Sequence, residues 1–480
     1  MITEIAWKNV WRNKTRSLTV IASVAVGVFA GVFTMAAINS SIVQRIDAAV
    51  NDELSHIQVN NKDFRSSGDI RNFMTDSAGI ASALTGTAGV TEITGRIIVR
   101  GVASTSAKST GVEITGVDIE KEKQMFTLSD KLIPGTGSYF APEKQGNSIF
   151  KPVFIGEKLA KDLNIIRYII TADALKQLEG KGVPAEVIAK LTPLQDQRFT
   201  SDKKFSRAID GLLSPREIKK YSLQVKETAW SYREGSKIIL SFLDMNNVQT
   251  GAAFRVCGIY RTNNDLFEAT SLFVPIDELR KLTGMSGGIY HRFIARLEDN
   301  DLTEKATGEL RMKLPAYEVL NWKEISPDLA MIADMMQQIY GIFMALILAA
   351  LAFGIVNTML MAVLERTREL GMLAAIGMNH RKMFSMIMLE SIFLSFVGGI
   401  AGMGIGEAVI ALTARKGINL VKYSEGMEAF GYSAHLFPSI DTQFFITTAV
   451  LIILTGILAS VYPARKALKL NPVEALRGEK

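Results

Sequence analysis

The chain is poor in the side chains that most enzymes use for covalent or metal chemistry. Its 480 residues include one cysteine and four histidines. Cys257 has no second cysteine to pair with, and the alternating apolar stretch around it predicts a buried strand residue. The histidines are scattered and none forms the metalloprotease motif H-E-x-x-H. We therefore expect no catalytic residues and neither a metal nor a cofactor bound by this chain.

The sequence also lacks the phosphate-binding loop G-x-x-x-x-G-K-[ST]. Without that backbone cradle and its lysine the chain is not expected to bind and hydrolyse ATP by itself. The formal net charge is +6, but the basic clusters flank apolar runs and are not interleaved with stacking aromatic residues. This arrangement argues against a nucleic-acid partner.

What the chain does have is four long apolar runs. Residues 17–44, 335–364 and 442–464 contain no charged side chain, and residues 383–413 contain only Glu390 and Glu407. Each run exceeds the roughly 20 residues that a helix needs to cross a bilayer. A mostly polar segment with short β-type and helical patterns separates the first run from the second. The sequence thus predicts a four-span α-helical membrane bundle, with one N-terminal and three C-terminal spans, and a large α+β domain between them.

Basic residues gather before the first run, between the second and third, and after the fourth. With four spans these segments share one side of the membrane, and the positive-inside rule places that side in the cytoplasm. We therefore expect a multi-pass protein of the inner (cytoplasmic) membrane with cytoplasmic N- and C-termini and an extracytoplasmic domain. Trp7 and Trp11, beside basic residues, predict an interfacial helix ahead of the first span, which we expect to remain as an anchor.

These patterns predict three parts. Residues 1–46 hold the interfacial helix and the first span, residues 47–331 the α+β domain, and residues 332–480 the last three spans with a cytoplasmic loop at 365–382 and a tail at 463–480. Strands are expected at 93–101, 111–117, 238–242 and 254–260, and helices at 77–84, 158–163 and 276–282. A helix-rich segment at about 166–234, punctuated by Gly and Pro, has the character of an insertion.

Two of the spans carry small residues at four-residue spacing. They are Gly27 and Gly31 in the first, and Gly398, Gly402 and Gly406 in the third. Such spacing lets helices approach closely in lipid. Two interpretations are open: packing within one bundle, or a seam between two copies of the bundle.

Carboxylates inside a membrane are costly and are functional candidates by default. Glu390 is near the cytoplasmic end of its run, where we expect it to reach the interface or to pair with Arg381 or Lys382. Glu407 is near the outer end, close to Arg415. A proton-relay role for either glutamate is the alternative.

The loop between the second and third runs alternates charged residues with a short apolar helix. We expect the residues that couple this loop to a partner to be Glu365, Arg366, Arg368, Glu369, Gly371, Ala374, Ala375 and Gly377. A compact helix that is apolar on one side and fringed by charge is suited to docking in a partner's groove. The alternative is a helix that rests on lipid headgroups.

Residues 364–378, Leu-Glu-Arg-Thr-Arg-Glu-Leu-Gly-Met-Leu-Ala-Ala-Ile-Gly-Met, resemble the cytoplasmic loop of FtsX-like permeases, the membrane subunits of MacB-type ABC transporters. Residues 462–467 and 471–477 resemble the closing motif of the same family. Residues 155–163, 256–260 and 272–276 are similar to the family too, particularly to lipoprotein-releasing permeases. The segment at 166–234 departs from the family pattern, because many relatives lack it.

The resemblance implies a permease that works as a homo- or heterodimer with a separate ABC ATPase subunit, which would bind the ATP and Mg²⁺. It implies ATP-driven motion passed to the extracytoplasmic domain, and a lipoprotein or amphiphile taken from among the membrane lipids as substrate. Lipoprotein release is the first choice. Drug or peptide efflux and FtsX-like regulation of an extracytoplasmic hydrolase remain alternatives.

Overall fold

The computed structural model describes residues 2–140, 144–145, 148–149, 151–423, 426–427, 432–439 and 442–468. The chain divides into two compact units. The first, called here the helical unit, comprises Met1–Ile46, Asp328–Glu425 and Tyr432–Lys480. The second, called the β-rich unit, comprises Asp47–Pro327 and Gly426–Gly431.

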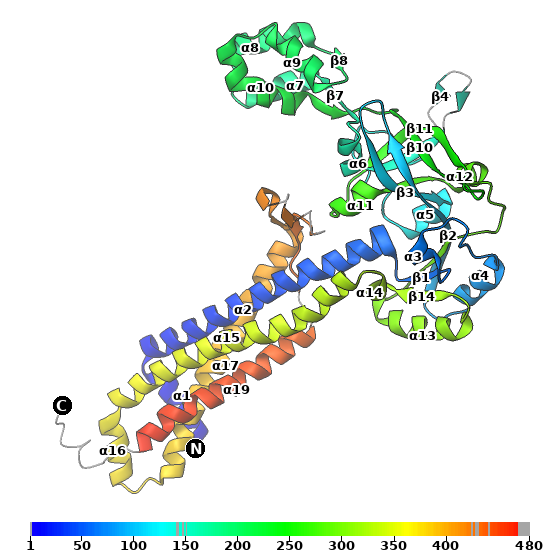
Figure 1. Cartoon of the computed structure of the whole chain (residues 1–480). Coiled ribbons are helices and arrows are strands. Elements are labelled where there is room, and N and C mark those ends of the chain that lie inside the picture. Colours follow the sequence, from blue (N-terminus) through cyan, green and yellow to red (C-terminus); the bar gives the residue numbers. More distant parts are fainter. Residues whose placement is uncertain are drawn as a thin grey trace. The chain divides into compact units, whose positions relative to one another are not determined.

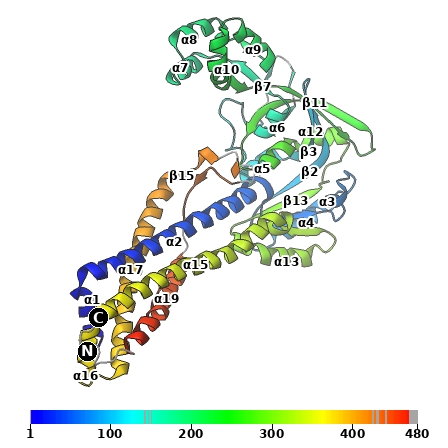
Figure 2. The same ribbon diagram turned by 60° about the vertical axis from the view of Figure 1, so that its left-hand side comes forward.

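The helical unit is built from four long helices. They are α2 (Lys14–Ala48), α15 (Pro327–Glu365), α17 (His380–Lys416) and α19 (Thr442–Leu468). In both ribbon views these helices run side by side (Figures 1 and 2). All four are long and apolar enough to cross a membrane. The predicted four-span bundle, one N-terminal span and three C-terminal spans, is therefore confirmed.

Two shorter helices lie in the same unit. Helix α1 (Ile2–Arg12) precedes α2 and is separated from it at Asn13, and α16 (Thr367–Ala375) follows α15. A two-stranded sheet of β15 (Ile418–Asn419) and β16 (His435–Leu436) joins the segments that flank α17 and α19. The core of the unit is a continuous apolar cluster that includes Ala6 and Val10 of α1. Helix α1 is therefore packed on the bundle through its apolar face.

The β-rich unit contains a closed barrel. Its strands are β10 (Lys237–Leu243), β11 (Gln249–Tyr260), β6 (Pro152–Gly156), β12 (Ser271–Pro275), β3 (Ser109–Val117) and β2 (Val90–Ser104). They pair in that order, and β10 also pairs with β2, which closes the ring. Closure leaves no free edge, and alternate residues of these strands fill the interior with branched apolar side chains.

The first half of β2 leaves the barrel and starts a second, antiparallel sheet in the order β2, β13 (Arg292–Leu297), β1 (Ile57–Asn60) and β14 (Glu318–Asn321). Helices α4 (Ser77–Thr85) and α13 (Thr303–Lys313) share an apolar core with this sheet. The shorter helices of the unit are α3 (Phe64–Ser67), α5 (Ile119–Met125), α6 (Glu157–Asp162), α11 (Asp265–Thr270), α12 (Ile276–Thr283) and α14 (Trp322–Ile325). The strands and helices expected from the sequence are all present, and the α+β class is confirmed.

The segment between α6 and β10 forms a module with its own apolar core. It contains the helices α7 (Ala172–Gly180), α8 (Ala185–Leu191), α9 (Asp202–Asp210) and α10 (Pro215–Ala229). A small sheet of β8 (Arg198–Phe199), β7 (Ile166–Ile169) and β9 (Trp230–Tyr232) holds its ends together, with Ile166 opposite Tyr232. Its entry and exit are thus adjacent, as an insertion into the barrel requires.

Candidate functional site

Helix α16 is a short connection between the two long helices that flank it, α15 and α17. Its C-terminal end is closed by the backbone N–H of Met378, which donates to the carbonyl oxygen of Leu373 at 3.0 Å. Gly377 has a φ of 95°, a left-handed conformation that favours glycine. Asn379 then caps α17 by accepting from the Arg381 backbone N–H. The turn is therefore fixed by local backbone chemistry and presents α16 at one end of the bundle.

A chain of four charged side chains ties α16 to its neighbours. Arg12 at the end of α1 donates to both carboxylate oxygens of Glu369. Arg366 donates through Nε to Glu369 at 3.0 Å and through Nη1 to both oxygens of Glu390 at 3.2 Å. Alternating Arg and Glu residues thus join α1, α16 and α17. The guanidinium of Arg12, followed by that of Arg366, holds the pKa of the Glu369 carboxyl below its usual value.

The partner of Glu390 differs from the expected one. Arg381 and Lys382 are exposed, whereas Glu390 is buried and bound by Arg366, 24 residues earlier in the chain. Arg366 stands at the break between α15 and α16, so its side chain reaches α17 at the level of Glu390. The prediction of an ion pair at Glu390 is confirmed, and the partner that the structure shows, Arg366, is one that the sequence analysis did not name. Glu407 is exposed on α17, and no ion pair joins it to Arg415 in the described part of the chain.

The residues expected to couple the loop to a partner fall into two groups. Arg366, Glu369 and the buried Gly371 face neighbouring helices. Glu365, Arg368, Ala375 and Gly377 are exposed; Ala374 lies in α16, and its side chain is outside the described residues. The predicted set of coupling residues left out Met372 and Ile376 of the short apolar stretch, which are 48% and 84% exposed. The exposed positions 368, 372 and 375 recur at helical spacing and form one face of α16, and the exposed Ile376 directly follows the helix.

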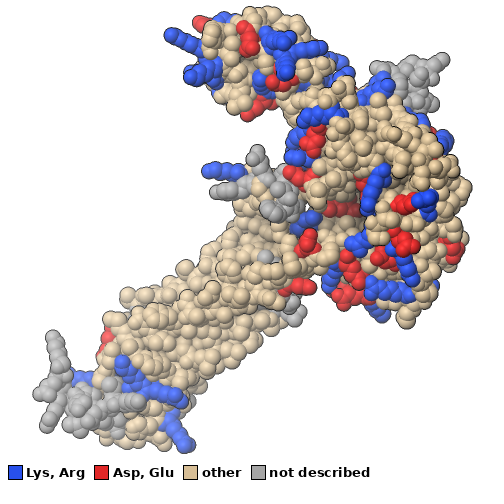
Figure 3. Space-filling view, viewed as in Figure 1, with Lys and Arg blue, Asp and Glu red and all other residues tan. Residues whose placement is uncertain are grey.

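Charged residues mark this end of the bundle. In the space-filling view the visible bundle surface is uncharged over most of its length, and Lys and Arg gather at the end where α16 lies (Figures 1 and 3). A cavity of about 540 Å³ opens beside the ion-pair chain and is lined by residues of α1 and of the α15–α16 junction. The motif at residues 471–477 lies outside the described residues.

The glycines at four-residue spacing all lie at helix contacts within the bundle. A Cβ added at Gly31 would be 3.0 Å from Ile347 of α15, and one added at Gly402 would be 2.5 Å from the carbonyl oxygen of Ala25 in α2. Gly27 faces Leu351, and Gly398 and Gly406 face α2 at Val24 and Val32. Helix α2 is therefore packed closely against both α15 and α17 of its own chain.

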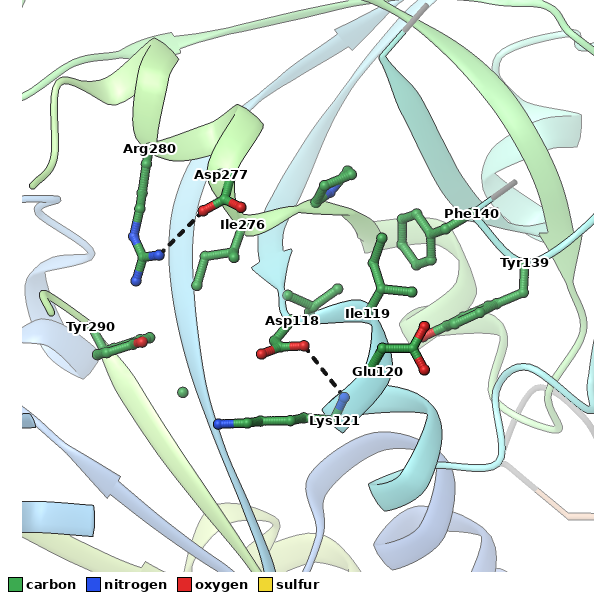
Figure 4. A pocket seen from close by; sticks show the side chains of 13 residues that line it. Asp118, Ile119, Glu120, Lys121, Tyr139, Phe140, Ile276, Asp277, Arg280 and Tyr290 are labelled. Atoms are coloured by element: carbon green, nitrogen blue, oxygen red, sulfur yellow. Dashed lines mark hydrogen bonds and ion pairs between the residues drawn. The ribbon is translucent and has the colours of Figure 1, made fainter. Parts of the chain in front are cut away.

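The β-rich unit has a polar cavity of about 530 Å³ at the carboxyl ends of the parallel strands β3 and β12 (Figure 4). Its acidic side chains are largely engaged: Asp118 caps α5 by accepting from the Lys121 backbone N–H, and Asp277 pairs with Arg280. Arg280 also lies over the ring of Tyr290, 5.1 Å from its centroid. The cavity is lined by three acidic side chains, Asp118, Glu120 and Asp277, and by two basic ones, Lys121 and Arg280, so its chemistry does not select a ligand class.

Residues 341–472 match the family described as FtsX-like permease C-terminal. The chain contains an FtsX-like permease domain. The matched segment includes α16, α17 and α19, which places the ion pair between Arg366 and Glu390 inside it.

Among relatives, the chain is 27% identical over 239 residues to the "Uncharacterized ABC transporter permease YknZ" of Bacillus subtilis (strain 168), with 48% of this chain and 55% of the relative covered. It is 31% identical over 166 residues to the "Macrolide export ATP-binding/permease protein MacB" of Bdellovibrio bacteriovorus, covering 34% of this chain and 23% of the relative. It is 22% identical over 231 residues to the "Lipoprotein-releasing system transmembrane protein LolC" of Xylella fastidiosa, covering 47% and 55%. The chain thus matches about half the length of YknZ and LolC, and less of MacB.

Two solved structures are similar to the chain. The extracellular domain of YknZ from Gram-positive bacteria aligns at 12% identity with a TM-score of 0.27, covering 55% of this chain and 98% of that domain. The periplasmic region of MacB from Actinobacillus actinomycetemcomitans aligns at 12% identity with a TM-score of 0.26, covering 60% and 97%.

Proposed function

We propose that this chain is the permease subunit of an ABC transporter and that a separate ATPase subunit docks on the exposed face of α16. The observation that supports this most directly is an exposed apolar surface that lies outside the four candidate membrane spans. Met372 lies in the nine-residue helix α16 between two spans, and Ile376 directly follows it. Arg368 of α16 and Glu365 at the end of α15 are exposed as well. A short amphipathic helix of this kind fits a groove in a partner protein.

The charge distribution supports a cytoplasmic position for this helix. Basic residues flank all four spans on the α16 side, which the positive-inside rule assigns to the cytoplasm together with both termini. The β-rich unit is then extracytoplasmic, and the protein belongs in the inner membrane. ATP and Mg²⁺ are bound by the partner, since this chain has no phosphate-binding loop.

Helix α15 supports a second permease subunit, identical or related. Only 11% of its most apolar stretch is buried, against 50% for α17. Exposed side chains such as Phe353, at 75%, and Ile342 and Leu346, at 62% each, are available to a second subunit, to membrane lipid or to an acylated substrate. We propose release or export of a lipoprotein or another amphiphile, with lipoprotein release first, because such cargo can enter sideways between apolar helices.

Copurification tests the docking role. In Met372→Asp and Ile376→Asp, a desolvated carboxylate replaces an apolar contact, so the ATPase should no longer copurify with the permease. Met312→Asp on α13 is the matched control, since Met312 is 79% exposed and lies in the β-rich unit. Wild-type recovery of the ATPase with both α16 variants would refute the docking role.

A further inference from the structure

A second cavity of the β-rich unit lies where the inserted module joins the barrel. It has a volume of about 430 Å³. Its walls come from the end of β2 and the following hairpin, from the residues after α6, from the loop between β8 and α9, and from the residues leading into β10. The lining residues are Ser104, Thr105, Ser106, Ala107, Asn164, Ile165, Thr200, Arg233, Ser236, Lys237 and Ile239. Two of the lining residues, Thr200 and Arg233, belong to the inserted module, so the insertion supplies part of the wall.

This cavity is lined by two cations and no carboxylate. Arg233 and Lys237 contribute the charges, and neither side chain has a hydrogen bond or ion pair within the described residues. Lys237 lies opposite Arg255 across the β10–β11 pair, and Arg255 is engaged, since it donates to the carbonyl oxygen of Gly235. The lining of this cavity thus carries two positive side chains and no negative one, whereas the cavity of Figure 4 is lined by both acidic and basic side chains.

The polar side chains around the two cations are hydroxyls and the amide of Asn164. Thr105 is occupied, because it donates to the carbonyl oxygen of Leu163 and accepts from the backbone of the hairpin. Ser104, Ser106 and Thr200 make no side-chain hydrogen bond within the described residues. An occupant with several acceptor oxygens could therefore receive bonds from hydroxyls as well as from both cations.

The module adds a broader positive field. Residues 166–234 contain 13 Lys and Arg against 9 Asp and Glu, an excess of four, in a chain whose net charge is +6. Clustered charge of one sign raises the local concentration of ligands of the opposite sign. The positive charge of the module and the donors that line the cavity thus both favour an anionic ligand.

We propose that this cavity is a binding site for a phosphate group, either free phosphate or the phosphate of a lipid-like headgroup. The planar fork of Arg233 suits two oxygens of a tetrahedral anion, and Lys237 supplies a point charge beside it. Because its walls belong to both the barrel and the inserted module, a bound phosphate would fix the module to the barrel. This site is separate from the docking face of α16, so either proposal can fail without the other.

Calorimetric titration of the full chain in a non-ionic detergent tests the site, with inorganic phosphate and glycerol 3-phosphate as the two ligands. Binding with one site per chain is expected, and it should weaken as salt is added. Tighter binding of glycerol 3-phosphate identifies a headgroup as the source, and equal or weaker binding identifies free phosphate. Absence of binding by both ligands would overturn the proposal.

Three variants locate the binding. The double variant R233Q/K237Q should bind at least about tenfold more weakly, because both charge-assisted contacts are lost. S106W fills the cavity while keeping both cations, and it should also lose binding. K176Q/K219Q removes two exposed charges of the same module that have no ion pair among the described residues and do not line the cavity, and it should bind as the wild type does. Normal binding by R233Q/K237Q or by S106W, or an equal loss in K176Q/K219Q, would show that phosphate binds elsewhere.

Discussion

Replacing Glu390 by glutamine tests whether the ion-pair chain holds α16 in position. Glu390 is 2% exposed and accepts two hydrogen bonds from Arg366, which in turn donates to Glu369 on α16. Glutamine keeps the shape and one acceptor oxygen but removes the charge. Arg366 then keeps a single carboxylate partner, and its side chain is only 15% exposed.

The size of the effect follows from the bond that is lost. A hydrogen bond to a charged group contributes about 2 kcal/mol, whereas removing all of one partner of a buried ion pair costs about 3–5 kcal/mol. Because the glutamine side chain would retain one acceptor and Arg366 retains Glu369, the lower figure applies. A loss of about 2 kcal/mol raises the population of displaced α16 roughly thirtyfold.

Spin labels can measure that displacement. One label at Ala375→Cys on α16 and one at Leu458→Cys on α19 report the distance between two exposed positions. Cys257 is buried and is replaced by alanine in this background. The wild type should give one narrow distance distribution, and E390Q a broad one, while E390D retains the charge and should remain close to the wild type.

The docking face is unchanged in E390Q, so the ATPase should still copurify. The rate of ATP hydrolysis by that ATPase should no longer depend on whether the permease is bound, because a loosely held α16 transmits less motion. A distance distribution and a hydrolysis rate equal to those of the wild type would show that α16 is positioned without this ion pair.

Three further outcomes follow from the packing and burial. Gly402→Ala places a Cβ 2.5 Å from the Ala25 carbonyl oxygen and should lower the free energy of unfolding by about 1–3 kcal/mol. In the control Gly404→Ala, on the same helix, the added Cβ meets nothing within 4 Å, so this variant should be as stable as the wild type or more stable. Equal melting temperatures of the two variants would contradict the close contact at Gly402. Replacing residues 168–230 by Asn-Gly joins the facing residues Arg167 and Ser231 through a hairpin turn. Circular dichroism should then show a folded barrel, and the ATPase should still copurify. Aggregation of this variant would show that the module is needed for folding. Burial lowers the pKa of His291 from 6.5 to about 4, so the folded state disfavours the charged imidazole. As the pH falls from 6.5 to 4, the wild type should therefore lose about 3 kcal/mol of folding stability relative to His291→Gln. A stability difference between the two proteins that does not change with pH would refute this.

The sequence by itself determined the four spans, the α+β class of the domain and the short helix between the second and third spans. These features depend on contiguous residues: the length of an apolar run, the alternation of side chains along a strand, and the glycine that follows α16. The loop also carried the family resemblance, and residues 341–472 bear it out.

Only the tertiary structure decided which charges of the loop are exposed and which are buried. Arg366 and Arg368 are two residues apart and have the same chemistry, but one is bound to Glu390 and the other is exposed. The closure of the barrel by β10 and β2 and the pairing of Arg12 with Glu369 likewise join residues more than 130 positions apart. Such contacts depend on where helices and strands meet in space, which no local pattern of residues specifies.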